Sequence, residues 1–195
     1  MIAARYKIPS ASPGSMLREE AMAGTPLGIE ANKLTSRGQL VPDDTVNALV
    51  ASWLASHDSE FVFDGYPRSI GQADGLEKML AVRGTPLDVV FSFEADLATL
   101  QKRVRNRAVC SQCRRNFSIG LHIAALDAPC PACSAPLTRR TDDTPETLGL
   151  RMREYADKTA PLISHYSKRG LLRAVDATRT PKEVFAEVAA TLEAP

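Results

Sequence analysis

Residues 61–74 read FVFDGYPRSIGQAD, and this stretch decides the fold. Residues 61–63 are all apolar, which is typical of a strand that is buried on both faces in a parallel sheet. Ligands of such sheets bind beyond the carboxyl ends of the strands, where Asp64 and Gly65 stand. A carboxylate there can hold a hydrated Mg²⁺ beside phosphates, and a glycine lets a ligand approach the backbone. The stretch therefore predicts a phosphate site at the end of a buried strand.

Arg68 and Gln72 follow within the same stretch. The guanidinium of Arg68 is a planar fork suited to phosphate, and Pro67 stiffens the turn that aims it. Gln72 carries both a hydrogen-bond donor and an acceptor, which can read the edge of an adenine ring. A strand-end turn with a surface ion pair would use the same residues, so this stretch alone leaves a functional and a structural interpretation open.

The rest of the chain alternates apolar strands with amphipathic helices. Residues 89–93 and 171–175 have the pattern of buried strands, and residues 8–12 that of a weaker one. Helices are predicted at 16–22, from Pro42 with an apolar stripe through Val46, Leu49, Val50, Trp53 and Leu54, at 69–82, after the cap Asp96, from Thr144 to a bend at Pro161, and from Thr180. This order predicts an α/β fold, a doubly wound parallel sheet with flanking helices.

The composition bounds the class of protein. The chain has 195 residues, of which 44% are hydrophobic and 24% charged, and its net charge is +1. These values suit one folded domain with a small insertion. The charge balance argues against a general nucleic-acid or membrane-surface binder, and we find neither an apolar run of about 20 residues nor a signal-peptide core. We expect a cytoplasmic protein without nucleic-acid or membrane partners.

Four cysteines follow the pattern C-x2-C-x16-C-x2-C, at Cys110, Cys113, Cys130 and Cys133. Two closely spaced thiolate pairs can close a tetrahedron around zinc, and four sulfur ligands leave no open position. The pattern therefore predicts a structural rather than a catalytic metal. A pair of disulfides or four unrelated thiols is the alternative, although disulfides are uncommon in cytosolic proteins. The three histidines are scattered and are not needed as ligands.

Several arginines lie near predicted strand ends and hinges. Arg103 and Arg107 are four residues apart, so a helix would point both side chains to one face. Arg140 precedes Asp142 and Asp143, and Arg151 lies on the next predicted helix. Any one of these arginines is most simply a solvated surface charge. Together they fit a clamp on charged phosphates better.

With these motifs the chain resembles the adenylate kinase family, whose members transfer a phosphoryl group from MgATP to AMP. The matching stretches are residues 12–18, 38–41, 63–68, 72–74 and 103–107, the four cysteines, and residues 140–143, 151 and 160–162. They cover essentially the whole chain, and DGYPR followed by QAD is specific. The resemblance implies the fold of the P-loop nucleoside monophosphate kinases, with a zinc-binding lid inserted.

The resemblance also implies a role for each matching residue. The residues implied in catalysis are Arg68, Arg107, Arg140, Arg151 and Asp64. The residues implied in AMP binding are Arg18, Gln39, Leu40, Val41, Gly65, Tyr66, Pro67, Arg68, Gln72, Arg140 and Arg151. The residues implied in ATP binding are Arg103, which would lie near the adenine, Arg107, Asn116, Phe117 and Arg179.

The family's organisation divides the chain into parts. Residues 1–106 and 145–195 would form the core α/β domain, with residues 12–41 as an AMP-binding flap within it, and residues 107–144 the zinc-binding lid. Closure of the lid would exclude water, so that AMP receives the phosphoryl group. The implied cofactors are a structural zinc ion and Mg²⁺ with ATP. The implied partners are ATP, AMP and ADP, and we expect a monomer.

One element of the family does not occur in the sequence. Family members begin with a strand and a glycine-rich loop ending in lysine and a hydroxyl residue, which cradles the ATP phosphates. No G-x-x-x-x-G-K-[ST] is present, and residues 1–6 match the end of the helix that follows that loop. We expect that the chain starts at an internal methionine of a longer reading frame and lacks roughly 20 residues, among them a central strand. The main electrostatic stabiliser of the phosphoryl group would be lost with them.

Two departures from the family concern nucleotide preference. Pro13 stands where a threonine usually lies near AMP, and Ser15 where an aspartate usually lies near Mg²⁺. A kinase for another nucleoside monophosphate therefore remains an alternative, and the missing loop adds a non-catalytic nucleotide-binding protein. A zinc-ribbon interaction module for nucleic acid is a further alternative, because basic residues flank the cysteines: Arg114, Arg115, Arg139 and Arg140.

Overall fold

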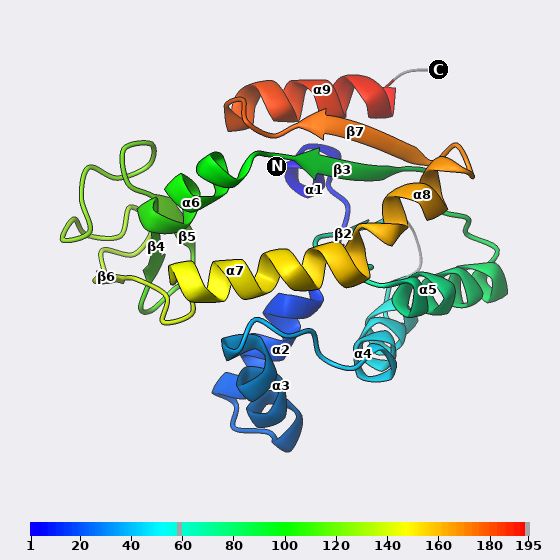
Figure 1. Cartoon of the computed structure of the whole chain (residues 1–195), viewed down its shortest axis with the longest axis horizontal. Coiled ribbons are helices and arrows are strands. Elements are labelled where there is room, and N and C mark those ends of the chain that lie inside the picture. The colour runs from blue at the N-terminus through cyan, green and yellow to red at the C-terminus, as the bar shows by residue number, and fades with distance from the viewer. Residues whose placement is uncertain (58–59, 194–195) are drawn as a thin grey trace.

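The computed structural model describes residues 1–57 and 60–193. The helices are α1 (Ile2–Tyr6), α2 (Pro13–Met22), α3 (Pro26–Ser36), α4 (Asp43–Ala55), α5 (Ile70–Arg83), α6 (Leu97–Asn106), α7 (Pro145–Glu154), the π-helical turn η1 (Tyr155–Thr159), α8 (Pro161–Ser167) and α9 (Pro181–Glu193). The strands are β1 (Ser10–Ala11), β2 (Val62–Phe63), β3 (Val90–Glu94), β4 (Arg107–Cys110), β5 (Asn116–Ser118), β6 (Leu137–Thr138) and β7 (Leu172–Asp176). Figure 1 shows their arrangement.

The strands of the core pair in parallel, and helices flank them, so the predicted α/β class is confirmed. β1 pairs with β2, and β3 pairs with β7 over five residues from Val90↔Leu172 to Glu94↔Asp176. Within the described residues the core strands form two separate parallel pairs and not the predicted single sheet. No hydrogen bonds join the pair β1-β2 to the pair β3-β7. A third sheet is antiparallel, with the order β5-β4-β6.

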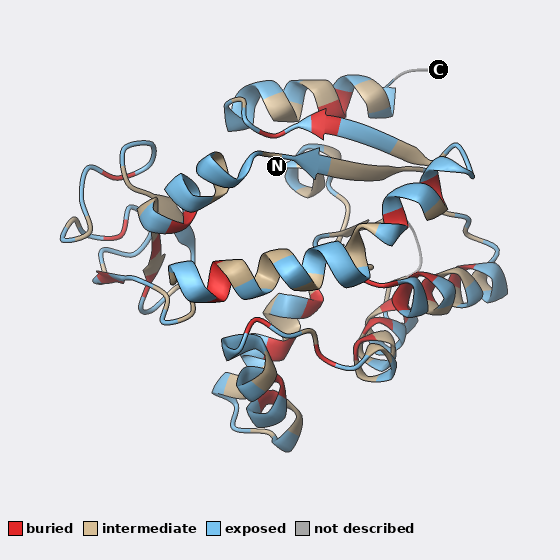
Figure 2. Ribbon diagram, in the orientation of Figure 1, coloured by how far each residue is buried: buried red, intermediate tan, exposed pale blue. Residues whose placement is uncertain are grey.

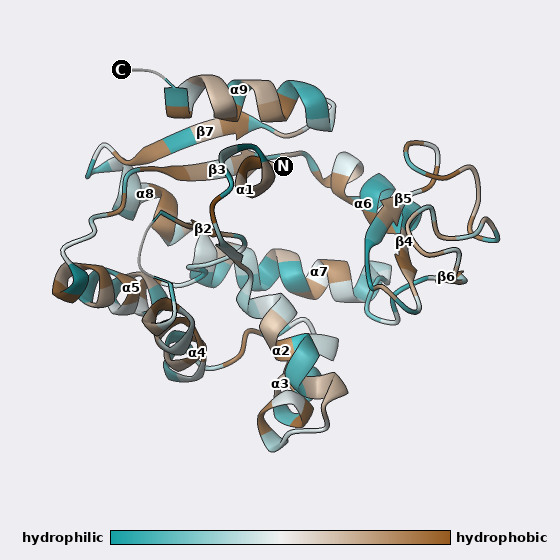
Figure 3. Ribbon diagram, turned by 180° about the vertical axis from the view of Figure 1, so that it is seen from behind, coloured by the Kyte–Doolittle hydropathy of each residue, from teal (hydrophilic) through white to brown (hydrophobic). Residues whose placement is uncertain are grey.

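The main hydrophobic core lies between α4, α5 and α2. The predicted stripe on α4 is confirmed, since Val46, Val50 and Leu54 are buried one turn apart and pack with Leu76 and Leu80 of α5. Figure 2 shows the buried residues gathered on the facing sides of these two helices. The rear view shows apolar segments alternating with polar ones along both helices (Figure 3). This amphipathic pattern fixes how the two helices pack.

The predicted helix starts at Asp96, Thr144 and Thr180 are confirmed by their caps, whereas α2 begins at Pro13, three residues before the predicted start. The carboxylate of Asp96 accepts from the N–H of Thr99 at 2.6 Å, and the hydroxyl of Thr144 accepts from the N–H of Thr147 at 3.1 Å. Thr180 and Glu183 form a capping box, with N–H donation in both directions. The helix α3, which packs closely on α2, was not predicted from the sequence.

The predicted bend before Pro161 takes the form of a π-helical turn. Ala160 donates its N–H to the carbonyl oxygen of Tyr155 at 2.8 Å, which is the wider hydrogen-bonding pattern of a π-helix. Pro161 then opens α8, where its missing N–H is tolerated. α7 and η1 form one long rod across the molecule, and α8 continues from its end at an angle (Figure 1).

The two ends of the described chain lie together. Arg5 donates to Glu193 at 2.8 Å, and Tyr6 donates to the same carboxylate oxygen at 2.8 Å. The antiparallel sheet of residues 107–138 lies at one end of the molecule, and α2 and α3 project from its lower side (Figure 1). Among the described residues, we find no helix with both the length and the apolar character to cross a membrane.

Candidate functional site

Two adjacent carboxylates just before α7, those of Asp142 and Asp143, contact three arginine side chains. Arg140 binds Asp142 with two hydrogen bonds of 2.9 and 2.6 Å, and Arg151 of α7 contacts the same carboxylate. Asp143 lies 3.2 Å from Arg107 of β4 and 3.7 Å from Arg151. Residues from the antiparallel sheet, the loop before α7 and α7 itself therefore converge at one point.

The charges at this point are strongly coupled. Burial raises the pKa of Asp142, but Arg140 and Arg151 outweigh this effect, so that its pKa lies below the ordinary value. The hydrogen bonds from Arg140 to Asp142 raise the pKa of Arg140. Three guanidinium groups face two carboxylates, so the cluster keeps an excess of positive charge. Such a site can attract and hold an anion with several oxygens.

Arg18 and Arg68 belong to the same electrostatic neighbourhood. Burial lowers the pKa of Arg18, and the positive charges of Arg140 and Arg68 lower it further, while Asp142 raises it. The guanidinium of Arg18 also donates to the hydroxyl of Ser15 at 2.8 Å. We call the set Arg18, Arg68, Arg107, Arg140 and Arg151 the arginine cluster.

The loop after β2 directs Arg68 toward α7. Gly65 has a positive φ of 69°, and a Cβ atom there would lie 2.9 Å from a terminal nitrogen of Arg68. The Nε–H of Arg68 donates to the carbonyl oxygen of Gly65 at 2.9 Å. Although the residue as a whole is exposed, crowding desolvates its guanidinium and lowers the pKa of Arg68; Asp64 opposes this effect and Arg151 adds to it.

The peptide groups of Arg68 are held from both sides. Its N–H donates to the side-chain oxygen of Gln72 at 2.8 Å, and its carbonyl oxygen accepts from the hydroxyl of Thr159 at 2.8 Å. Gln72 is only 2% exposed, and its side-chain nitrogen donates to Asp43 at 2.9 Å. Neither Thr159 nor Asp43 is among the site residues predicted from the sequence, because neither residue stands in a motif.

The other residues expected around AMP lie between α4, α5 and α7. Gly38 is buried with a φ of 74°, and a Cβ atom there would lie 2.8 Å from the Cβ of Leu150 on α7. Of the next three residues, Gln39 is exposed, Leu40 is partly buried and Val41 is buried. Tyr66 is buried and donates to Asn47 at 2.6 Å, and Pro67 is partly buried. Asp64, which is expected in catalysis and not in AMP binding, is exposed at the end of β2.

The residues expected around ATP are more scattered. Arg107 does not share a helix face with Arg103, and this expectation is wrong: α6 ends at Asn106, because Arg107 takes extended backbone angles and pairs with Ser118 in the sheet. The guanidinium of Arg103 instead donates to the carbonyl oxygen of Ala177, after β7. Arg179 is nearby in the chain and ion-pairs with Asp176 at 3.6 Å.

The remaining two ATP candidates lie on β5. Asn116 is exposed, and Phe117 packs on the small core of the antiparallel sheet. A hollow of about 350 Å³ lies at the ends of β3 and β7, lined by Glu94, Asp96, Asp176 and Thr178. It is separate from the residues of the arginine cluster and lies beside Arg179.

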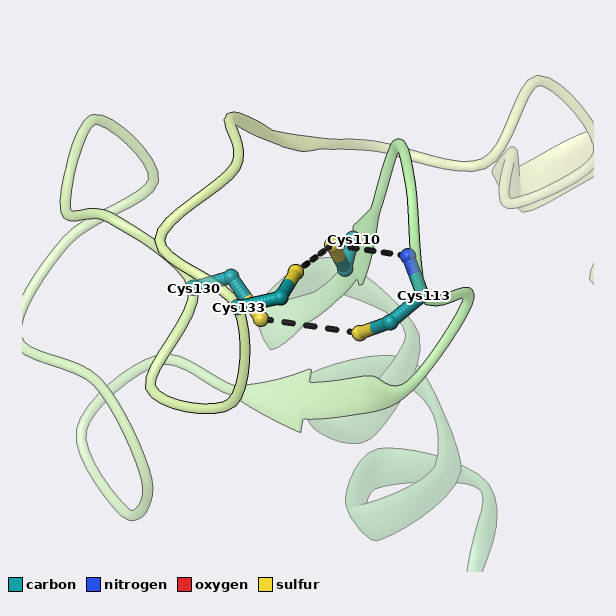
Figure 4. A group of neighbouring side chains, drawn as sticks. All are labelled: Cys110, Cys113, Cys130 and Cys133. Carbon is teal, nitrogen blue, oxygen red and sulfur yellow. Dashed lines mark hydrogen bonds between the residues drawn. The ribbon is translucent and has the colours of Figure 1, made fainter.

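The four cysteines meet inside the antiparallel sheet and its loops (Figure 4). Their sulfur atoms all lie within 4.8 Å of one another, with Cys110 and Cys133 at 3.4 Å and Cys113 and Cys130 at 3.7 Å. These distances exclude disulfides in this structure, since a disulfide bond is about 2.05 Å long. A tetrahedral zinc with bonds of about 2.3 Å separates its sulfur ligands by about 3.8 Å. The four thiols therefore fit a zinc ion.

Backbone groups support the same interpretation. The N–H of Cys113 points to the sulfur of Cys110 at 3.3 Å, and that of Ala132 to the sulfur of Cys130 at 3.4 Å. Burial raises the pKa of Cys110, but backbone N–H groups of Cys113 and Gln112 and the neighbouring thiols lower it to about 6 in net. The thiolate is the form that binds metal, so the lowered pKa favours Cys110 as a ligand. The backbone N–H of Arg115 lowers the pKa of Cys113, but burial and the neighbouring thiols raise it in net to about 11. The arrangement can close a metal centre with four thiolate ligands.

The basic residues beside the cysteines do not form one free surface. Arg139 donates to the carbonyl oxygen of Arg105, and Arg140 is engaged with Asp142. Two of the four arginines that would support a nucleic-acid module are thus used within the protein.

Comparison with known proteins agrees with the geometry. The profile of the family described as adenylate kinase matches residues 1–171. An adenylate kinase of Thermodesulfovibrio yellowstonii is 37% identical over 191 residues, covering 97% of this chain and 89% of the relative. Adenylate kinases of Geobacter sulfurreducens (37% over 190 residues, 96% and 88%) and Kosmotoga olearia (38% over 194 residues, 98% and 90%) are similarly close. The chain therefore belongs to the adenylate kinase family.

Proposed function

We propose that this chain binds AMP and ATP and takes part in the reversible transfer of a phosphoryl group from MgATP to AMP, which gives two molecules of ADP. Membership of the family supports a phosphotransferase that acts on nucleotides. The observation that carries the proposal is the arginine cluster, which brings positive charge from β4, α2, α7 and the loop after β2 to one place.

The cluster suits the chemistry of phosphoryl transfer. The transferring group spreads negative charge over three oxygens, and catalysis consists largely of positioning and electrostatic stabilisation. Arg140 and Arg151 are paired with Asp142 in the structure, so binding of a phosphate exchanges one anionic partner for another. Arg68, Arg107, Arg140 and Arg151 are the proposed catalytic guanidinium groups, and Asp64 is proposed to lie beside Mg²⁺, which would neutralise phosphate charge when bound with ATP.

The two nucleotides would approach from different sides. AMP would lie along residues 39–41, 65–68 and 72, with Arg18 on its phosphate. ATP would lie toward Arg103, Arg107, Asn116, Phe117 and Arg179. Residues 12–41 would act as a flap and residues 107–144 as a lid stiffened by structural zinc, whose ligands would be the four cysteines. The remainder, residues 1–106 and 145–195, would form the core of a cytoplasmic monomer.

A non-catalytic nucleotide-binding role is the second candidate, because the sequence contains no G-x-x-x-x-G-K-[ST]. The test compares two proteins: this chain, and this chain preceded by a strand and such a loop. ADP formation from ATP and AMP by the extended protein, but not by this chain, would assign catalysis to the combination and nucleotide binding to this chain. If neither protein forms ADP and this chain binds no AMP while folded, the proposal is wrong.

The experiment also needs a variant that isolates the cluster. In whichever of the two proteins forms ADP, Arg151→Ala should lower kcat/KM by about 100-fold or more, since it removes a charge proposed to face the transferring group. Arg114→Ala is the control, because Arg114 is exposed in the cysteine loop outside the cluster. Comparison of AMP with UMP, CMP and GMP as acceptors decides which monophosphate the chain prefers.

A further inference from the structure

The side chain of Gln72 is held in one orientation by its neighbours. Its nitrogen donates to one carboxylate oxygen of Asp43 at 2.9 Å, and its oxygen accepts from the N–H of Arg68 at 2.8 Å. An ionised carboxylate only accepts hydrogen bonds, and a backbone N–H only donates. Turning the amide of Gln72 around would therefore place oxygen against oxygen and N–H against N–H. Both neighbours demand the same orientation.

Asp43 is itself fixed between two helices. It is the first residue of α4, and its second carboxylate oxygen accepts from the hydroxyl of Ser69 at 2.7 Å. Ser69 caps α5 and is only 8% exposed. A Cβ atom on Gly71 would lie 2.5 Å from that same oxygen of Asp43, so the absence of a side chain at Gly71 leaves room for the carboxylate. The position of Asp43 is thus set by the packing of α4 on α5.

The amide of Gln72 still has unused hydrogen-bonding capacity. A glutamine amide has two N–H donors and two acceptor lone pairs. Asp43 and Arg68 use one of each, and within the described part of the chain no other group takes the remaining donor or the remaining lone pair. Because Gln72 is 2% exposed and buried polar groups are usually paired, this leftover donor and acceptor suit a bound ligand.

We propose that Asp43 is a positioning residue that sets the base preference of the monophosphate site by fixing the order of donor and acceptor on Gln72. The proposal rests on the function proposed above, in which Gln72 faces the base. Adenine presents an amino donor beside a ring-nitrogen acceptor. A 6-oxopurine presents an acceptor beside a ring N–H donor, which is the reverse order. An amide locked by Asp43 and Arg68 can pair with only one of these edges when the phosphate is held in place.

The alternative is that Asp43 serves only to join α4 to α5. A purely structural role would change the affinity for every ligand of the site by the same factor. A role in base preference changes the ratio of two affinities. The probes are therefore AMP and IMP, which carry the same sugar and phosphate and differ at the base edge that Gln72 would read.

The experiment measures both dissociation constants by calorimetry for this chain and for three variants. The unchanged chain is expected to bind AMP about tenfold or more tightly than IMP, because the wrong order leaves buried groups unpaired. Asp43→Ala is expected to reduce this ratio to about threefold or less. Asp43→Asn is expected to keep most of the ratio, since its carbonyl oxygen can still accept from Gln72 and its amide can donate to Ser69. Asp44→Ala, at an exposed neighbouring acid, controls for the loss of charge at the helix start.

The outcomes separate the two proposals. If the folded, unchanged chain binds neither AMP nor IMP, the proposed function fails, and the role of Asp43 fails with it. If the unchanged chain prefers AMP and Asp43→Ala keeps that preference at any affinity, only the role of Asp43 is overturned. Should Asp43→Ala fail to fold, Asp43→Leu, which has the same branching but no hydrogen-bonding atoms, supplies the same comparison, and an unchanged ratio there overturns the proposal.

Discussion

Thr159, the last residue of η1, donates its hydroxyl to the carbonyl oxygen of Arg68 over 2.8 Å. This bond ties the π-helical turn of the long rod to the loop that follows β2. The same rod carries Arg151 on α7; burial lowers the pKa of Arg68, and the charge of Arg151 adds to this effect. The separation of two proposed phosphate-binding groups is therefore set in part by one hydroxyl at a turn where the helix widens.

Replacement of Thr159 by valine should weaken the binding of AMP. The change removes the hydroxyl at nearly constant volume and leaves the carbonyl oxygen of Arg68 without this partner. We expect a loss of about fivefold in affinity, corresponding to about 1 kcal/mol for one hydrogen bond. Adenosine should bind Thr159→Val and the unchanged chain equally, because it lacks the phosphate. Calorimetric titration with both ligands measures the effect, and Thr159→Ser should restore it; an equal loss for adenosine would contradict a role through Arg68.

Replacement of Gly65 by alanine should weaken the binding of AMP. Its φ of 69° is strained for other residues, and a Cβ atom would meet the guanidinium of Arg68 at 2.9 Å. Gly84 offers a matched control, since its φ is 67° and nothing lies within 4 Å of its Cβ position. Both alanine variants should lose about 1 kcal/mol in the free energy of unfolding. Only Gly65→Ala should also weaken AMP binding, which denaturation and titration of both variants would show.

Local patterns were sufficient to predict much of the fold. The stripe on α4 and the caps at Asp96, Thr144 and Thr180 are short-range features, in which the interacting residues lie within a few positions of one another. The cysteine spacing likewise predicts a tetrahedral centre, and the four cysteines do lie together. These features depend on helix periodicity and ligand geometry, which a single sequence displays directly.

Long-range pairing was not predictable in the same way. The helical pattern continues through Arg107, but the pairing of Arg107 with Ser118 draws that residue into β4 and away from the face of Arg103. The contact between Thr159 and Arg68 spans 91 positions, and no motif marks Thr159. Asp43 and Gln72 are 29 positions apart and meet only because α4 packs on α5. The nucleotide contacts themselves remain predictions.

Loss of metal should affect the antiparallel sheet more than the rest of the protein. The buried residues of that sheet form a small hydrophobic cluster of their own, which includes Cys110 and Cys130. We expect chelation of zinc, or Cys113→Ser, to speed amide hydrogen exchange in residues 107–138 and to leave α4 and α5 protected. Metal analysis should find about one zinc per chain before treatment. Gln112→Ala is the control beside the cysteines, since Gln112 is exposed and its side chain makes no hydrogen bond within the described residues, and equal deprotection in α4 would contradict a local role.

The free energy of unfolding at low pH should depend on the ionisation of Asp142. Burial raises its pKa, but Arg140 and Arg151 outweigh this effect and hold the pKa below its ordinary value of 3.8. Because the folded pKa is depressed, the stabilisation is present above pH 3.8 and is lost as the pH falls through the folded pKa. Asp142→Asn should therefore lower the free energy of unfolding by about 1–3 kcal/mol at pH 7, and by progressively less below pH 3.8. Urea denaturation across this range measures the difference.

The control is Asp88→Asn, because Asp88 is exposed and forms no ion pair among the described residues. This change should leave the dependence of stability on pH as it is in the unchanged chain. A loss that matches that of Asp142→Asn would show that the effect is not specific to the arginine cluster.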